Sequence, residues 1–176
     1  MHRSRLWVMG LLLSLALLPT ACKKAAPPAL TWQQVQNAEY RNELPQKGIA
    51  TLKDGLYEEE IVPGSASKIT LALIPDKYAF GDLNGDKAAD AVAILVASGG
   101  GSGSFVNLEA LVNEQGAPKH VAEFALGDRT RIEALSIQDG RITVDVVTHG
   151  PNDPMCCPSV KARRTLKLQG EQLVEQ

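Results

Sequence analysis

At the centre of the chain stands Phe80-Gly81-Asp82-Leu83-Asn84-Gly85-Asp86-Lys87-Ala88-Ala89-Asp90, followed directly by Ala91-Val92-Ala93-Ile94-Leu95-Val96. The second half is apolar almost throughout, which predicts a central β-strand over residues 91–98 that is buried on both faces. The first half places side-chain oxygens at relative positions 1, 3, 5 and 9, on Asp82, Asn84, Asp86 and Asp90. A tight loop with this spacing can turn several oxygens toward one hard cation.

Apolar and polar residues alternate with period two on both sides of this stretch. The pattern is clear around Ile69–Leu73, Ile142–Val146 and Leu166–Leu168, and it is typical of strands with one buried face. Asp139-Gly140 predicts a type I′ turn that joins residues 131–138 and 141–148 in a hairpin. We therefore expect a mostly β, sandwich-like domain of about eight to ten strands in an antiparallel meander or curved sheet.

One short helix is predicted before the strands. Thr31-Trp32-Gln33-Gln34 has the form of a capping box, and Leu30 and Val35 are placed to form a hydrophobic staple around it. The helix is expected to run from Trp32 to about Tyr40 and to pack its apolar side chains on the sheet. Trp32 fits a core position better than a ligand-stacking one at this spacing.

The loop itself resembles the strand–loop–strand calcium motif of FG-GAP and integrin-type β proteins. It is also similar to a group of uncharacterised bacterial lipoproteins that carry a single such loop. The resemblance implies that Ca²⁺ is held by the side chains of Asp82, Asn84, Asp86 and Asp90 and by the carbonyl of Ala88. An EF-hand is excluded because position 12 is Ala93, inside the predicted strand.

Position 6 of the loop departs from the pattern. It is Lys87, where glycine is usual because the turn requires a positive φ. The alternative is an Asn-Gly turn whose carboxylates are simply solvated.

Residues 1–21 form a secretory signal, with a basic start, an apolar core over Leu6–Leu18 and small residues before Cys22. Leu18-Pro19-Thr20-Ala21-Cys22 resembles the lipobox of bacterial lipoproteins, which implies cleavage before Cys22 and a lipid anchor on that cysteine. An uncleaved anchor or plain secretion is the alternative. Lys23 after the cysteine implies, by the same resemblance, sorting to the outer membrane. Residues 22–29 are then a Pro-containing tether, and residues 30–176 are a single domain.

The charge of the chain does not favour nucleic acid. The formal net charge is −2, and loss of Arg3 and Arg5 with the leader makes it −4. No basic stripe or aromatic platform accompanies this balance, so we expect no nucleic-acid partner.

Cys156 and Cys157 are the remaining cysteines, in the segment Pro151–Pro158. In an oxidising envelope they can form a vicinal disulfide that stiffens the turn. Two alternatives stay open, namely thiol-redox chemistry and a soft metal held with His149 and Met155.

Two further segments fit structural roles. Gly99–Ser104 lacks the Lys-Ser/Thr ending of a phosphate loop and reads as a hairpin connection. Glu58-Glu59-Glu60 reads as a charged strand edge.

No catalytic residue can be assigned from these patterns. We expect a non-enzymatic, lipid-anchored envelope protein, facing the periplasm or the cell surface, that binds another envelope component or a glycan. The alternative is an envelope enzyme, thiol-redox or hydrolase, that uses the Pro151–Cys157 turn.

Overall fold

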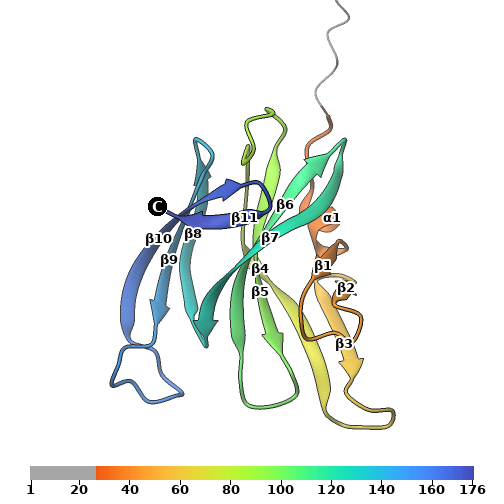
Figure 1. Cartoon of the computed structure of the whole chain (residues 1–176), viewed down its shortest axis with the longest axis vertical. Helices are drawn as coiled ribbons and strands as arrows, with labels where there is room; N and C mark the ends of the chain where they lie inside the picture. Colours follow the sequence, from red (N-terminus) through yellow and green to blue (C-terminus); the bar gives the residue numbers. More distant parts are fainter. Residues whose placement is uncertain (1–26) are drawn as a thin grey trace, which may run out of the picture.

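The computed structural model describes residues 27–176. The predicted signal peptide, the predicted lipidation site at Cys22 and most of the predicted tether lie outside the described residues. The described chain is mostly β, as predicted, and contains one short helix (Figure 1). Its elements are α1 (Trp32–Gln36), β1 (Glu39–Arg41), β2 (Ile49–Thr51), β3 (Leu56–Glu60), β4 (Lys68–Gly81), β5 (Asp90–Ser98), β6 (Phe105–Glu114), β7 (Ala117–Asp128), β8 (Arg131–Gln138), β9 (Arg141–Thr148), β10 (Val160–Gln169) and β11 (Gln172–Glu175).

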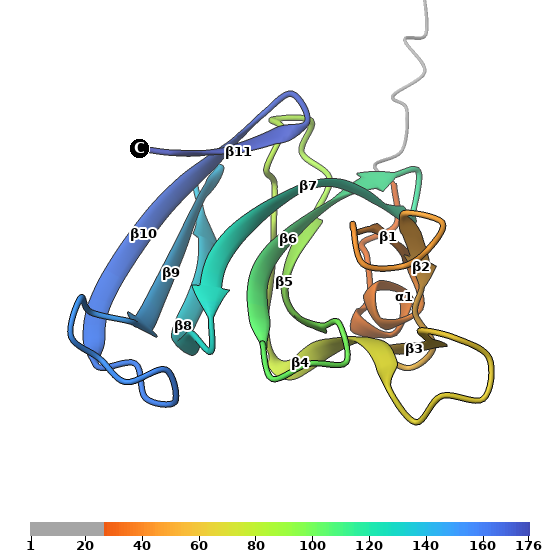
Figure 2. The same ribbon diagram turned by 60° about the horizontal axis from the view of Figure 1, so that its bottom comes forward.

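Every strand pairs antiparallel with its neighbours, and the strands form three sheets. The largest has the order β3-β4-β5-β6-β7, the second has the order β11-β10-β9-β8, and β1 and β2 form a separate hairpin. The five-stranded sheet curls around α1 and the β1–β2 hairpin, while β8–β11 lie on its other side (Figure 2). This is the curved antiparallel meander that the alternation of apolar residues predicted.

Strand β5 is central because it is buried on both faces. Ala91, Ala93 and Leu95 belong to an apolar cluster shared with α1 and the β1–β2 hairpin. Val92 and Ile94 belong to a second cluster shared with β9, β10 and β11. The continuous apolar run predicted this position, since a strand with one solvated face would alternate.

The helix begins as predicted and ends earlier than predicted. Thr31 caps it in a capping box with Gln34, and Leu30 and Val35 are both buried in the same cluster. The extension to Tyr40 is wrong. The backbone N–H of Asn37 donates to the Gln34 carbonyl and that of Ala38 donates to the Val35 carbonyl, which closes the last turn, and the chain then enters β1. Tyr40 lies in that strand.

The turns follow the sequence closely. Asp139 and Gly140 both have positive φ, at 51° and 70°, and they join β8 to β9 in the predicted hairpin. Gly99–Ser104 connects β5 to β6 as a hairpin loop, and β3, which carries Glu58–Glu60, is an edge strand. The described chain has eleven strands rather than eight to ten. The surplus comes from short strands such as β1, in a segment predicted to be helical.

Candidate functional site

The Asp-rich loop connects the end of β4 to the start of β5. Asp82 and the glycine at position 85 hold its first bend, because Asp82 Oδ1 accepts a hydrogen bond from the backbone N–H of Gly85 at 2.6 Å. Asp82 Oδ2 accepts from the N–H of Lys87 at 2.9 Å. Lys87 has a φ of 70°, so the departure from glycine does place a lysine in the left-handed region.

The side chains of Asn84 and Asp86 accept backbone hydrogen bonds in the same way as Asp82. Asn84 Oδ1 accepts from the N–H of Asp86 at 2.9 Å, and Asp86 Oδ1 accepts from the N–H of Ala88 at 2.7 Å. The Asn84 amide also donates to Asp86 Oδ2 at 3.0 Å. The loop is therefore folded around its own side-chain oxygens, which are acceptors of the kind that Ca²⁺ prefers.

Asp90 differs from the other members because it is fully buried. Its Oδ2 accepts from the N–H of Leu83, and its Oδ1 accepts from the N–H of Asn113, both at 2.8 Å. Burial raises the pKa of the Asp90 carboxyl, the two N–H donors oppose that shift, and the charges of Asp86 and Asp82 add to it. The charges of Asp82 and Asp86 thus disfavour the ionised form of Asp90.

The fit of a cation to this loop depends on the remaining lone pairs. Each carboxylate can accept about four hydrogen bonds or ligand contacts, and Asp82, Asp86 and Asp90 each use two. Within residues 27–176, however, no three His, Cys, Asp or Glu side chains converge closely enough to hold a metal ion. The donors have the right chemistry, and binding would require the carboxylates of Asp82, Asp86 and Asp90 to come closer together.

The loop also borders a groove of about 640 Å³. Asp139 and Gly140 of the β8–β9 turn and Lys167 of β10 also line this groove. A bound ion would therefore stiffen a bend that lies between the two larger sheets.

The cysteine segment lies at the far end of the molecule, in the β9–β10 loop (Figure 1). Cys156 and Cys157 are both exposed and are joined in a disulfide. Asp153 organises the loop by accepting from the N–H of Gly150 at 2.9 Å and from the N–H and hydroxyl of Ser159, each at 2.8 Å. A soft metal would need this disulfide reduced, because thiolates are the ligands.

A buried acid–imidazole pair was not predicted from the sequence. Glu109 of β6 is fully buried, and its Oε2 lies 2.7 Å from His120 Nε2 of β7. His120 Nδ1 accepts a hydrogen bond from the backbone N–H of Arg41 at 3.1 Å. The sequence offers one indication, which is that Glu109 stands among apolar residues in the segment Leu108–Leu111. This does not predict that its partner is His120, eleven residues further on.

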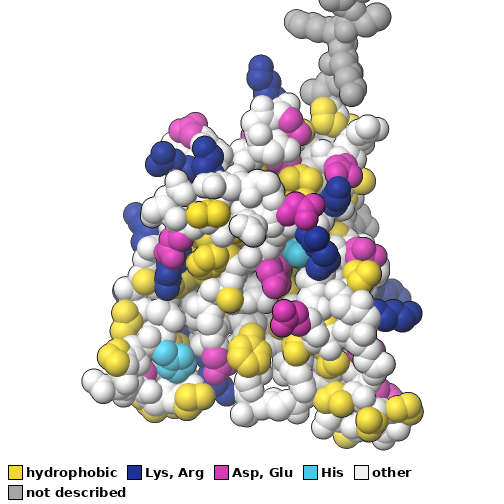
Figure 3. Space-filling view, in the orientation of Figure 1, with side chains coloured by type: hydrophobic (Ala, Val, Ile, Leu, Met, Phe, Trp, Pro, Cys, Tyr) yellow, Lys and Arg dark blue, Asp and Glu magenta, His cyan; other side chains and the backbone are white. Residues whose placement is uncertain are grey.

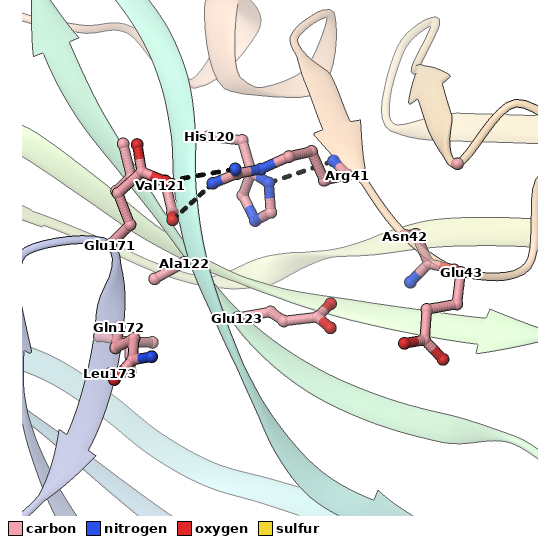
Figure 4. A pocket seen from close by; sticks show the side chains of 11 residues that line it. Arg41, Asn42, Glu43, His120, Val121, Ala122, Glu123, Glu171, Gln172 and Leu173 are labelled. Carbon is pink, nitrogen blue, oxygen red and sulfur yellow. Dashed lines mark hydrogen bonds and ion pairs between the residues drawn. The ribbon is translucent and has the colours of Figure 1, made fainter.

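His120 also lines an open groove of about 520 Å³ (Figure 4). The Arg41 guanidinium crosses its rim, donating to the carbonyl of Val121 at 2.7 Å and to Glu171 at 3.4 Å. Glu123 extends from β7 into the groove, toward the side where Asn42 and Glu43 lie. The charged groups that line the groove are mostly carboxylates.

The outer surface has no dominant charge on the face shown in Figure 3, where Lys and Arg side chains are interspersed with Asp and Glu. No helix in residues 27–176 is long and apolar enough to cross a membrane.

Comparisons with known protein families, with characterised proteins and with solved structures found no match.

Proposed function

We propose that the chain is a lipid-anchored protein of the bacterial outer membrane, whose non-enzymatic β domain binds another envelope component or a glycan. The leader, the lipobox-like segment ending at Cys22 and the Pro-containing tether support the anchor. Several acyl chains on one cysteine give a stable anchor where a single chain would be marginal.

The observation that carries the proposal is the way the domain meets its tether. The carbonyl of Pro28 accepts a hydrogen bond from the Asn113 side chain at 3.0 Å. A Cβ added to Gly116 would lie 2.6 Å from the ring of Pro28, so the chain is seated tightly on the β6–β7 turn. In this proposal the anchored end of the domain is the one where Pro28 packs, and the β9–β10 loop lies at the opposite end (Figure 1).

Anchoring is tested by metabolic labelling with a radioactive fatty acid in a bacterium that processes lipoproteins. The wild-type chain should be labelled and should fractionate with the outer membrane. Cys22→Ala should lose the label, and a Cys156→Ala, Cys157→Ala double variant should keep it. Absence of label on the wild-type chain contradicts the proposal.

The Asp-rich loop is proposed as a structural Ca²⁺ site formed by Asp82, Asn84, Asp86, the Ala88 carbonyl and Asp90. An envelope site can be weak, with Kd on the order of 10⁻⁴ to 10⁻³ M, and still fill from extracellular calcium. EDTA should lower the Tm, millimolar Ca²⁺ should restore it, and Asp86→Ala should remove the response. Asp76→Ala, an exposed acid on β4, is the matched control. An unchanged wild-type Tm leaves the solvated turn as the better account.

The exposed disulfide favours one alternative, a thiol-redox enzyme of the envelope. In that reaction a substrate dithiol would be oxidised to a disulfide while Cys156–Cys157 accepts two electrons and becomes a dithiol. The double alanine variant separates the two proposals. Loss of stability alone supports the turn as structural, whereas loss of turnover with a dithiol substrate supports the enzyme.

A further inference from the structure

The Glu109–His120 pair has one proton position that its hydrogen bonds define. Because His120 Nδ1 accepts from the Arg41 N–H, the imidazole proton is on Nε2, which donates to Glu109 Oε2. The second carboxyl oxygen, Oε1, is buried and has no hydrogen-bond partner among residues 27–176. An ionised Glu109 would therefore be a buried anion held by a single hydrogen bond.

The charged groups around the pair do not neutralise such an anion. They come from β1 and its flanks, from β7 and from the β10–β11 turn, namely Glu39, Tyr40, Arg41, Glu43, Lys119, Glu123 and Glu171. The Tyr40 hydroxyl donates to the Val35 carbonyl, and Lys119 pairs with Glu114. The Arg41 guanidinium points to Val121 and Glu171.

Glu123 makes ionisation of Glu109 less favourable still. The two residues are directly opposite each other in the β6–β7 ladder, so their side chains lie on the same face of the sheet. Burial is the main cause that raises the pKa of Glu109, the hydrogen bond from His120 opposes it, and the charge of Glu123 adds to it.

The pair lies directly under the N-terminal cover, which we define as residues 30–52 with α1, β1 and β2. The cover contacts it through the Arg41 N–H and through the buried ring of Tyr40, whose centroid lies 5.4 Å from that of His120. Glu109 is fully buried, and so is Tyr40 on the inner side of the cover. Movement of the cover would therefore bring water to Oε1.

We propose that Glu109 holds a proton on Oε1 while the N-terminal cover is closed, and that release of this proton is coupled to opening of the cover. The pair is then a pH-sensitive latch that is closed on the acidic side and opens as the pH rises. The sign follows from linkage, because the closed state binds one more proton than the open state in which Glu109 is hydrated.

Hydrogen exchange by NMR on the full chain in detergent tests the latch. The observed exchange rate of the Arg41 N–H, divided by its intrinsic rate at each pH, measures opening of the cover. This ratio should rise about tenfold per pH unit between the ordinary Glu pKa and the raised pKa of Glu109, and then level off. The carboxyl ¹³C signal of Glu109 should titrate at the pH where it levels off.

Two isosteric variants distinguish the residue responsible. Glu109→Gln should make the ratio independent of pH, while Glu123→Gln should keep the slope. The wild-type measurement decides the question even where Glu109→Gln does not fold. A flat wild-type ratio, or a Glu109 signal that titrates with the exposed glutamates, overturns the proposal. A slope shared by the N–H of Val144, in the other apolar cluster, also overturns it, because whole-domain unfolding would then release the proton.

Discussion

The carboxylate of Asp90 accepts the backbone N–H of Asn113 at 2.8 Å inside the protein. This bond ties the Asp-rich loop to the end of β6, one strand away. The Asn113 side chain in turn donates to the carbonyls of Ala89, at 3.2 Å, and Pro28, at 3.0 Å. One residue pair therefore joins the loop, the β6–β7 turn and the start of the domain.

Asp90→Ala should destabilise the domain strongly. The substitution leaves the N–H groups of Leu83 and Asn113 buried without an acceptor, and each such group costs about 1–3 kcal/mol. We expect a loss of about 2–4 kcal/mol in the free energy of unfolding measured with urea, without calcium. Asp76→Ala should lose less than about 0.5 kcal/mol. A small loss for Asp90→Ala would show that water replaces the carboxylate.

Lys87→Gly should stabilise the loop. Lys87 holds a φ of 70°, and a non-glycine residue in that region costs about 1 kcal/mol. The change should raise the free energy of unfolding by about 0.5–1 kcal/mol and enlarge the Tm shift caused by calcium, because an ammonium group is removed from the site. Lys87→Ala removes the charge and keeps the strain, so only the calcium effect should remain. Equal stabilities of the two variants would contradict the role of φ.

Gly81→Ala should destabilise the contact between the two larger sheets. A Cβ at this position would lie 2.6 Å from Ile137 Cγ2 and 2.9 Å from Ile137 Cβ. Forced overpacking of this kind costs about 1–3 kcal/mol. Ile137→Ala in the same chain removes the nearer atom, so a double-mutant cycle should show a favourable coupling of about 0.5 kcal/mol or more. If the losses of stability in the two single variants simply add in the double variant, the destabilisation by Gly81→Ala does not come from contact with Ile137.

The Asp153 loop should respond to acid. The N–H of Gly150, followed by the hydroxyl of Ser159, holds the pKa of Asp153 below its usual value. Because the pKa of Asp153 is lowered in the folded loop, its ionised carboxylate stabilises the loop fully above the ordinary Asp pKa. This stabilisation is lost as the pH falls through the lowered pKa. The amide signals of Gly150 and Ser159 should shift together in that range. Asp153→Asn should remove the shared shift, and separate midpoints would contradict a common acceptor.

Much of the fold could be predicted because it depends on local rules. The Asp139-Gly140 turn, the doubly buried β5 and the Thr31 cap each follow from a backbone preference or a hydrophobic period confined to a few residues. The extent of α1 could not, because the chain leaves the helix where Tyr40 gains a buried position in β1.

The site was predictable only where its members are neighbours in sequence. The spacing of Asp82, Asn84 and Asp86 in the sequence predicts that they share one loop. No sequence pattern predicts that Asp90 accepts a hydrogen bond from Asn113. Glu109 and His120 meet because β6 and β7 pair with a register shift between Ala110 and Leu111. Alternation of apolar residues does not predict where such a β-bulge lies. It therefore cannot predict which residues face each other across the two strands past the bulge.

The seating of Pro28 has a mechanical consequence. Any pull on the chain ahead of the domain meets the Pro28–Asn113 hydrogen bond and the packing of Pro28 on Gly116 before it reaches α1. The force is transmitted to the β6–β7 turn, next to the loop that Asp90 holds in place. The contact between α1 and the sheet therefore does not carry this force.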